Sequence, residues 1–591
     1  MKKQTLTQRD RSAAAKASSF AAAADVHHPR LRSISDDELD EIFVLIGGEL
    51  RNGRSSKAEE ILTDALESRT LSPDAFANLK RLLSFTLETL GRYKESLSVV
   101  KPFEDEENLS QLSVETQVRV TTQLAIAYSN LSDQPKAVTL LKENLTKAQE
   151  NELTHLSGNI DNALARVYRK LNECPIARDY GEKSLNYFRS NGDWIGMAEA
   201  YREIALSHHQ EGSSERSLEY FDLGIKIIGS HAAPFMLGKL YTDMSGAYWF
   251  LRRPHDGIAC LEKSIEFFDQ TEHVLNSIIA YNNLGINLML IGEWQKADDV
   301  INRALDLARK QNHVHVAGIM DSLGELKILR EQFDDAERLL TDAVRIAKDR
   351  KREWYAAQSM RNLARCYLAQ GRFAEAAEKA RETIDLSGQI GERHYANMAG
   401  LVLAESLLKL GRLDESENYL RVIEDSDPTS DFFVLGNIQR IRGLTALEND
   451  DAELAIHHFN RSLTIFESAE DIYHTALVHY LIGTHLDGSQ SSRAIKHLTA
   501  ADEVFRKLGI RSFTDAITDK IGKLKTSTGV TKEQRRSSVV AQLLMVRLAE
   551  ATASRELLFR ELVAVLTQES QASRIIVAEY NSAQQLVPFI T

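Results

Sequence analysis

The chain is poor in the residues that break helices. It has 9 prolines and 30 glycines among 591 residues, and no proline lies between Pro254 and Pro428. A β-sandwich or β-barrel needs turn residues about every 8–12 positions, and this stretch does not supply them. Collagen-like and proline-rich classes are excluded on the same ground. The scarcity predicts a long, mostly helical protein.

Cysteines and long apolar runs are scarce as well. The three cysteines, Cys174, Cys260 and Cys366, lie far apart and form no C-x-x-C pair, which predicts reduced thiols in a helical core. The sequence has no run of about 18 apolar residues, so no membrane-spanning helix is expected. The basic, Ala/Ser-rich N-terminus lacks the apolar segment of a secretory signal. We expect residues 1–34 to be a disordered tail and the protein to be cytoplasmic.

The overall charge limits the classes of partner. The net charge is −13, with 43% hydrophobic and 27% charged residues. This composition is typical of a globular chain that can bury a core. An acidic chain disfavours a chain-wide surface for polyanions, although a local basic face stays possible. We therefore expect neither direct nucleic-acid binding nor membrane binding.

A repeat is the strongest pattern in the sequence. Similar segments begin at intervals of about 40 residues or multiples of it. Each has a large residue followed by a small one, then an aromatic or aliphatic residue three positions later. The segments are Tyr201–His208, Tyr241–Tyr248, Tyr281–Leu288, Met360–Tyr367 and Gly400–Leu407.

Turn residues and small residues follow each of these segments at fixed offsets. The turn residues include Asn172, Gly212, Gly292, Gly371 and Gly411. Small residues at fixed positions let two helices approach closely, while large ones fill the space between successive hairpins. The prolines Pro135, Pro175 and Pro254 fall where a second helix begins, a position that needs no amide hydrogen. The pattern predicts a series of helical hairpins.

This arrangement resembles the tetratricopeptide (TPR) repeat, and most closely the longer repeats of kinesin light chains and large bacterial regulators. The tryptophan of the TPR signature is replaced here, for example by Tyr201, Tyr241 and Tyr281. The resemblance implies an all-α superhelical solenoid of about twelve hairpins over residues 35–520. Such arrays have many unrelated roles, so the fold does not define the function.

The pattern changes after the array. Residues 521–535 are polar and predict a linker, and residues 536–570 predict a connecting helix that could pair with itself as a coiled coil. Residues 571–591 then predict two strands joined by the turn at 582–585. This order resembles the start of a GAF domain, which implies that the chain is the front part of a longer protein. The alternative is that the hairpin packs on the last helix as a cap.

Motifs for catalysis and cofactors are missing from the sequence. It contains no P-loop, no G-x-G-x-x-G, no H-E-x-x-H and no G-x-S-x-G. The 17 histidines do not follow metal-ligand spacing; His208-His209 and His457-His458, for example, are adjacent and diverge on a helix. We expect no enzyme activity, no metal and no cofactor.

The inner face of the solenoid is the candidate binding surface. In such solenoids the first helix of each hairpin lines the concave groove, and arginines there bind carboxylates bidentately. The resemblance to kinesin-light-chain repeats implies that Asn283 and Asn362 bind a peptide backbone. Alternatively, the arginines pair with Glu203, Glu325 and Glu405 of neighbouring helices. The candidate residues are Asn162, Arg166, Arg169, Arg202, Trp249, Asn282, Asn283, Arg361, Asn362 and Arg365.

Two functional interpretations remain. The first is a sensory and protein-interaction module of a bacterial-type cytoplasmic signalling protein. It would bind a protein, a peptide or a small effector and relay the signal to a C-terminal output domain. By analogy with regulators that combine such repeats with GAF domains, we favour transcription activation as the output. The second interpretation is a passive scaffold or adaptor without an output domain.

Overall fold

The structure is a computed structural model of the whole chain. It describes residues 32–33, 36–229, 231, 233–311, 313–426, 431–486, 490–527, 577–580 and 586–590. The predicted connecting helix at 536–570 and residues 1–31 of the predicted tail lie outside these ranges. The chain forms two compact units. Unit 1 comprises Met1–Ala247 and Glu262–Ser277, and unit 2 comprises Tyr248–Leu261 and Ile278–Thr591.

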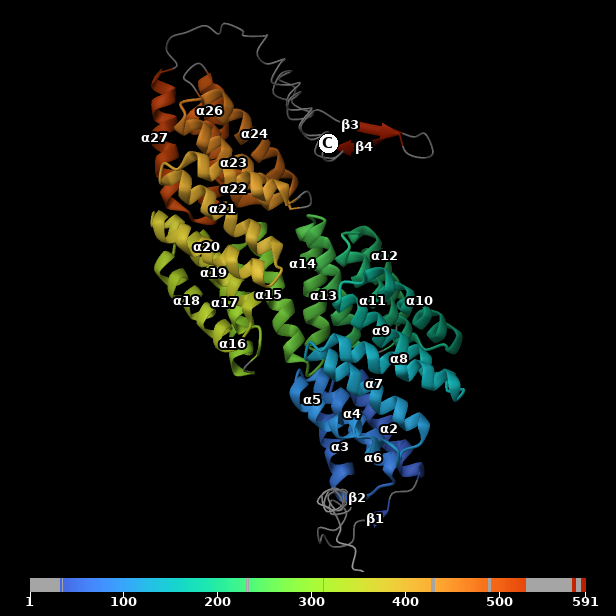
Figure 1. The fold of residues 1–591 in the computed structure, drawn as a ribbon. Helices are drawn as coiled ribbons and strands as arrows, with labels where there is room; N and C mark the ends of the chain where they lie inside the picture. The colour runs from blue at the N-terminus through green and yellow to red at the C-terminus, as the bar shows by residue number, and fades with distance from the viewer. Residues whose placement is uncertain are drawn as a thin grey trace, which may run out of the picture. The chain divides into compact units, whose positions relative to one another are not determined.

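The described residues contain twelve consecutive helical hairpins, as the repeat predicts (Figure 1). The first helices of the hairpins are α2 (Asp36–Arg51), α4 (Pro73–Thr89), α7 (Val114–Asn130), α9 (Ser157–Lys170), α11 (Trp194–Gln210), α13 (Pro234–Phe250), α15 (Val274–Leu290), α17 (Val316–Leu329), α19 (Glu353–Ala369), α21 (Arg393–Lys409), α23 (Phe432–Glu448) and α25 (Ile472–His485). The predicted all-α solenoid is therefore confirmed.

The second helices run back along the first. They are α3 (Ser55–Ser68), α5 (Tyr93–Val100), α8 (Gln134–Glu150), α10 (Cys174–Asn191), α12 (Ser214–Ile228), α14 (Pro254–Phe268), α16 (Trp294–Lys310), α18 (Phe333–Asp349), α20 (Phe373–Gln389), α22 (Leu413–Asp425), α24 (Ala452–Ser468) and α26 (Ser491–Leu508). The final helix α27 (Arg511–Ser527) continues through residues 521–527, where the sequence predicts the start of a linker. Short helices η1 (Lys101–Glu104), α6 (Glu106–Leu109) and η2 (Thr154–Leu156) connect early hairpins.

Small residues allow the two helices of a hairpin to touch. A Cβ built on Gly324 of α17 would lie 2.6 Å from Leu340 of α18, so only glycine fits this crossing. Ala336 and Ala343 of α18 are fully buried in the same way. The predicted turn glycines have positive φ values, as at Gly371 (76°), where a side chain would be strained. These features explain the repeat at the level of packing.

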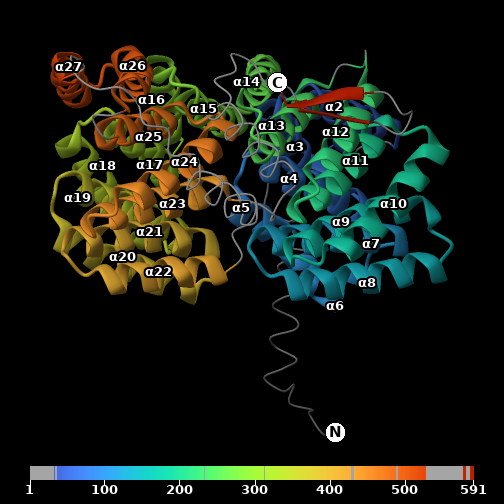
Figure 2. The ribbon, with the colours of Figure 1, turned by 90° about the horizontal axis from the view of Figure 1, so that it is seen from above.

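Each unit closes on itself, because its first hairpin turns contact its later elements. In unit 1, the amide of Glu272 donates to the carbonyl of Gly53 at 2.9 Å. The amide of Ser56 donates to the Glu272 carboxylate, which is 216 residues further along the chain. In unit 2, the Trp294 ring at the start of α16 and the Tyr473 ring of α25 lie 5.9 Å apart, and in the view from above α15, α16, α25 and α26 fall on the same side of the unit (Figure 2). Early and late elements of each unit are therefore in contact.

Two short pairs of strands lie outside the hairpins. β1 (Arg32–Ser33) pairs in parallel with β2 (Arg69–Thr70). β3 (Val577–Tyr580) pairs antiparallel with β4 (Leu586–Ile590), which is the hairpin that the sequence predicts at the end of the chain. The cysteines Cys174, Cys260 and Cys366 are buried and are not joined in disulfides, in line with the predicted reduced thiols.

Candidate functional site

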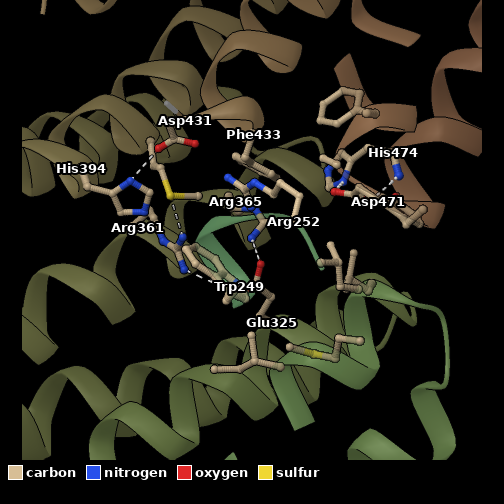
Figure 3. Close-up of a pocket in the computed structure, with 18 residues that line it drawn as sticks. Trp249, Arg252, Glu325, Arg361, Arg365, His394, Asp431, Phe433, Asp471 and His474 are labelled. Carbon is tan, nitrogen blue, oxygen red and sulfur yellow. Dashed lines mark hydrogen bonds and ion pairs between the residues drawn. The ribbon is translucent and has the colours of Figure 1, made fainter. Parts of the chain in front are cut away.

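A cavity of about 180 Å³ lies inside unit 2. Its walls come mainly from the first helices of successive hairpins, which is where the sequence places the binding groove (Figure 3). The apolar part of the wall includes Trp249, Ile286, Met289, Leu290, Leu329, Met398, Phe433, Phe466, Ala469 and Tyr473. The charged and titratable residues of the wall are Arg252, Glu325, Arg361, Arg365, His394, Asp431, Asp471 and His474. The cavity therefore combines aromatic surface with several fixed charges.

Two predicted arginines of α19 contact acidic residues of α17. Arg365 donates to Glu325 at 2.5 Å, and Arg361 lies 3.6 Å from the same carboxylate. Arg361 also donates to the sulfur of Met398 at 3.0 Å, while its Nε is buried without a hydrogen-bond acceptor in the described part of the chain. Burial opposes the charge of Glu325, but Arg365 and Arg361 outweigh it and hold its pKa below the usual range. These ion pairs hold the side chains of Glu325, Arg361 and Arg365 in place in the wall of the cavity.

The predicted residue Asn362 lies behind the cavity rather than in its wall. It is fully buried, donates to Asp321 at 3.1 Å and accepts a hydrogen bond from Arg365 at 2.9 Å. Asp321 is itself buried, and this burial raises its pKa to about 6 although Arg361 opposes the shift. Asn362 therefore connects α17 to α19 in the described structure.

Two Asp–His pairs form the opposite walls of the cavity. Asp431 caps α23 by accepting from the amide of Val434, and it pairs with Nδ1 of His394 at 2.7 Å. Asp471 caps α25 in the same way, through the amide of His474, and pairs with Nδ1 of that histidine at 2.7 Å. Burial opposes ionisation of Asp431, but the His394 hydrogen bond keeps its pKa low. Each aspartate thus has a partner of its own.

Arg252 enters the cavity from the turn between α13 and α14. Its guanidinium lies 5.0 Å from the Trp249 ring and 5.5 Å from the Phe432 ring. Its Nε is buried without a hydrogen-bond acceptor among the described residues. Burial lowers its pKa, and Asp431 and Asp471 partly offset this through their charges. Figure 3 places Arg252 with Arg361 and Arg365 between the two Asp–His pairs.

Four of the predicted residues belong to unit 1, and three of them, the arginines Arg166, Arg169 and Arg202, meet around one buried carboxylate. Glu203 of α11 is 1% exposed. It accepts from Arg169 at 2.9 Å, contacts Arg202 at 3.2 Å and lies 3.4 Å from Arg166. Arg202 also pairs with Asp243 at 2.5 Å, and Asn162 donates to Glu199 at 3.3 Å. The alternative interpretation, in which arginines pair with Glu203 of a neighbouring helix, is observed here.

Groove arginines also pair with the other two acidic residues named in the sequence analysis, Glu325 and Glu405. Arg365 pairs with Glu325, as described above, and Arg440 pairs with Glu405 at 2.5 Å. The remaining candidates differ from one another. Asn282 of α15 has a buried Oδ1 without a hydrogen-bond partner in the described ranges, whereas the backbone carbonyl of Asn283 accepts from Asn287 at 2.9 Å. Trp249, Arg361 and Arg365 are the predicted residues that line the cavity.

Five charged or titratable residues of the cavity were missing from the sequence prediction. His394, Asp431, Asp471 and His474 belong to helix starts, and Arg252 occupies a turn position. One signal could have found a pair of them: Asp471 and His474 have the spacing of an N-cap aspartate and a residue in the first helical turn. Arg252 stands at a turn position that is glycine in some hairpins and Ser, Asn, Glu or Asp in others, so its position predicted a turn rather than a site.

No group of three or more His, Cys, Asp or Glu side chains among the described residues could hold a metal ion. None of the described helices is both long enough and apolar enough to cross a membrane.

The fold and the repeated hairpins define a helical-repeat protein of the TPR type. Residues 269–498 match the family model of the MalT-like TPR region. No curated protein sequence gives a significant match to the chain.

Several solved structures are similar in fold at low sequence identity. The apo form of RapI is 11% identical, with a TM-score of 0.40 over 46% of this chain and 98% of that one. The apo form of the quorum sensor NprR from B. thuringiensis is 15% identical, with a TM-score of 0.42 over 66% and 97%. A Rap protein complexed with Competence and Sporulation Factor is 14% identical, with a TM-score of 0.46 over 60% and 98%.

Proposed function

We propose that the chain is a non-catalytic sensory and interaction module, and that the cavity of unit 2 binds a peptide segment or a small effector. The observation that carries this proposal is the cavity itself, in which aromatic and apolar walls surround several charged groups. Ligand sites typically combine a mainly apolar concave surface with a few convergent polar groups.

The size of the cavity limits what it can enclose. A cavity of about 150 Å³ lined by apolar side chains can hold one benzene ring, so a cavity of about 180 Å³ fits a side chain or a small organic group. A longer peptide would place one side chain in the cavity, and its other residues would lie along the first helices of the hairpins. A folded protein partner would need to insert such a residue.

The position of the cavity supports a relay role in this proposal. Its wall includes Trp249 and Ile286 near the start of unit 2, and Phe466 and Tyr473 from its last hairpins. A ligand that contacts both groups favours one curvature of the unit over others. The helices α26 and α27 follow these last hairpins and would carry the change toward the C-terminus.

A second part of the proposal concerns the domain that would receive the signal. We infer that the β3–β4 hairpin begins a GAF-like domain of a cytoplasmic transcription regulator, in line with the predicted order of elements at 571–591. Reading the coding frame beyond Thr591 tests this inference. A continuation into a GAF domain and an output domain is expected, and an immediate stop codon would favour the passive scaffold.

A ligand screen tests binding in the cavity. Short peptides and small organic fragments are screened against the full chain by ligand-observed NMR. The variant Leu329→Trp fills the cavity from α17, and Leu454→Trp adds the same ring at an exposed position of unit 2 that does not line the cavity. We expect hits whose signals vanish with Leu329→Trp and persist with Leu454→Trp. Hits that are insensitive to Leu329→Trp would contradict the proposal.

A further inference from the structure

The acidic groups of the cavity in unit 2 already have close partners. Glu325 is bound by Arg365, Asp431 by His394, and Asp471 by His474. The aspartates also accept hydrogen bonds from backbone amides at the starts of α23 and α25. These carboxylates are therefore held in fixed positions by groups other than Arg252.

Arg252 differs from the other two arginines of the cavity. Arg361 and Arg365 lie within 4 Å of a carboxylate. For Arg252, the described residues supply two aromatic rings but neither a hydrogen bond nor an ion pair within that distance. Burying a cation without a bound anion costs free energy, and burial indeed lowers the pKa of this guanidinium. The charges of Asp431 and Asp471 offset the cost only through space.

The backbone adds a second cost at the same residue. Arg252 has a φ of 56°, in the left-handed region that favours glycine. The corresponding turn position is glycine in several hairpins, as at Gly212, Gly292 and Gly371, whereas Asn172 and Glu331 adopt the same conformation in others. The backbone conformation therefore does not favour arginine at this position. The side chain extends between the Trp249 and Phe432 rings toward the cavity.

We propose that Arg252 binds the carboxylate of the ligand of this cavity, with the aromatic walls holding an apolar or aromatic group next to that carboxylate. This inference depends on the proposed binding function of unit 2. A guanidinium binds a carboxylate through two parallel hydrogen bonds. Trp249 and Phe432 fix the guanidinium plane, while Phe433, Phe466 and Tyr473 supply the apolar contact.

The charges around Arg252 favour a single negative charge on the ligand. Within the described ranges, the Arg252 guanidinium has no carboxylate within ion-pair distance, and a single ligand carboxylate would neutralise its charge. A phosphate dianion would bring a second charge close to Asp431 and Asp471, where like charges repel. Both a peptide with a free C-terminus and a small organic acid present the required group, and the test separates these two sources.

The test uses two matched pairs of probes and the full chain. The first pair is 3-phenylpropionate and its neutral analogue 3-phenylpropan-1-ol. The second is the dipeptide acetyl-Ala-Phe with a free carboxylate and the same dipeptide as its amide. Binding of each probe is measured by ligand-observed NMR titration to wild type, Arg252→Met, Arg252→Lys and Arg253→Met. Arg253 is the matched control, because it is adjacent, exposed and paired with Asp256.

We expect at least one acid to bind wild type about tenfold more tightly than its neutral analogue. A hydrogen bond between charged groups typically strengthens binding by at least this factor. Arg252→Met should remove this preference, Arg252→Lys should retain part of it, and Arg253→Met should leave it unchanged. Circular dichroism checks that each variant keeps its helices. A preference confined to the dipeptide indicates a peptide ligand, and one shared by both acids indicates the organic-acid chemistry alone.

Two outcomes would overturn the inference. One contradicts only the assignment of the carboxylate to Arg252, and the other also contradicts the proposed binding function of unit 2. If acids and neutral analogues bind wild type equally, or if Arg252→Met keeps the preference, the carboxylate assignment is wrong. In that case Leu329→Trp still tests the cavity, and loss of binding in this variant leaves the proposed function intact. If no probe binds at millimolar concentration in a way that Leu329→Trp abolishes, both the inference and the proposed function fail.

Discussion

Arg169 donates a hydrogen bond from Nε to the carboxylate of Glu203 at 2.9 Å, and this carboxylate is 1% exposed. Arg166 and Arg202 approach the same carboxylate from two other directions. Burial alone would raise the pKa of Glu203, but the three arginines hold it well below its usual range. Glu203 thus contacts three cations inside unit 1, of which Arg202 also pairs with Asp243 and Arg166 also lies 3.6 Å from Glu88.

The first prediction concerns this carboxylate. Glu203→Ala should lower the free energy of unfolding of unit 1 by about 3–5 kcal/mol, because it removes the carboxylate that Arg169 contacts and one of the two carboxylates near Arg166 and near Arg202. Urea unfolding followed by circular dichroism measures the change. The control is Glu60→Gln, whose exposed pair with Lys57 should contribute less than about 1 kcal/mol. A similar loss in both variants would show that the Glu203 cluster adds no more than a surface pair.

The second prediction concerns Asp321 and pH. Its pKa is raised to about 6 by burial in the folded chain, whereas an unfolded aspartate titrates near about 3.9. Folded unit 2 therefore binds a proton between about pH 4 and pH 6 that the unfolded chain lacks, so its stability falls as the pH rises through this window. Asp321→Asn carries no such proton and should gain about 2 kcal/mol relative to wild type between pH 4 and pH 7.

Urea unfolding at several pH values between 4 and 7 measures this difference. Asp335→Asn is the matched control in unit 2, because Asp335 is 56% exposed and pairs with Arg338 at the surface. This control should follow the pH profile of wild type. If Asp321→Asn also runs parallel to wild type, Asp321 is ionised in the folded chain throughout the window.

The sequence predicted the hairpins because its small residues mark the helix crossings directly. Ala336, Ala343 and Ala376 are fully buried at the predicted offsets, and Gly371 and Gly411 have the left-handed turn conformation. The period also identified which helices line the groove. These features depend on contacts within one hairpin or between neighbours, so one repeat predicts the next.

The site was predicted less completely, because charge pairing between hairpins depends on side-chain reach. Arg166, Arg169 and Arg202 follow the pattern of groove residues, yet they meet at Glu203. Arg252 was missed because a turn position gives no sign that its side chain reaches a cavity. The closure of each unit, as between Gly53 and Glu272, joins residues far apart in the chain and has no local signature.

The third prediction separates a structural asparagine from a binding one. Asn362 is fully buried and hydrogen-bonded to Asp321 and Arg365. Asn362→Ala should therefore destabilise unit 2 by about 1–3 kcal/mol, since it leaves buried polar groups without a partner. Asn283→Ala changes a partly exposed candidate of the same unit and should cost less than about 1 kcal/mol. Thermal unfolding compares them, and equal shifts in Tm would argue against an interior role for Asn362.

The fourth prediction tests how unit 1 closes. Gly53 has a φ of 72°, and a Cβ there would lie 2.5 Å from Cβ of Thr271. Gly212 in the same unit has a φ of 83°, with no atom within 4 Å of such a Cβ. Alanine at either position incurs the backbone strain of about 1 kcal/mol, but Gly53→Ala also pushes against Thr271. We expect it to cost about 1–3 kcal/mol more than Gly212→Ala in urea unfolding.

Hydrogen exchange shows whether the extra cost arises at the closure. The amide of Glu272 donates to the carbonyl of Gly53 at 2.9 Å, so its protection reports this contact directly. Gly53→Ala should speed exchange at Glu272, while Gly212→Ala should leave it at the wild-type rate. If the two alanine variants protect Glu272 equally, the approach of Gly53 to Thr271 does not determine the stability of this contact.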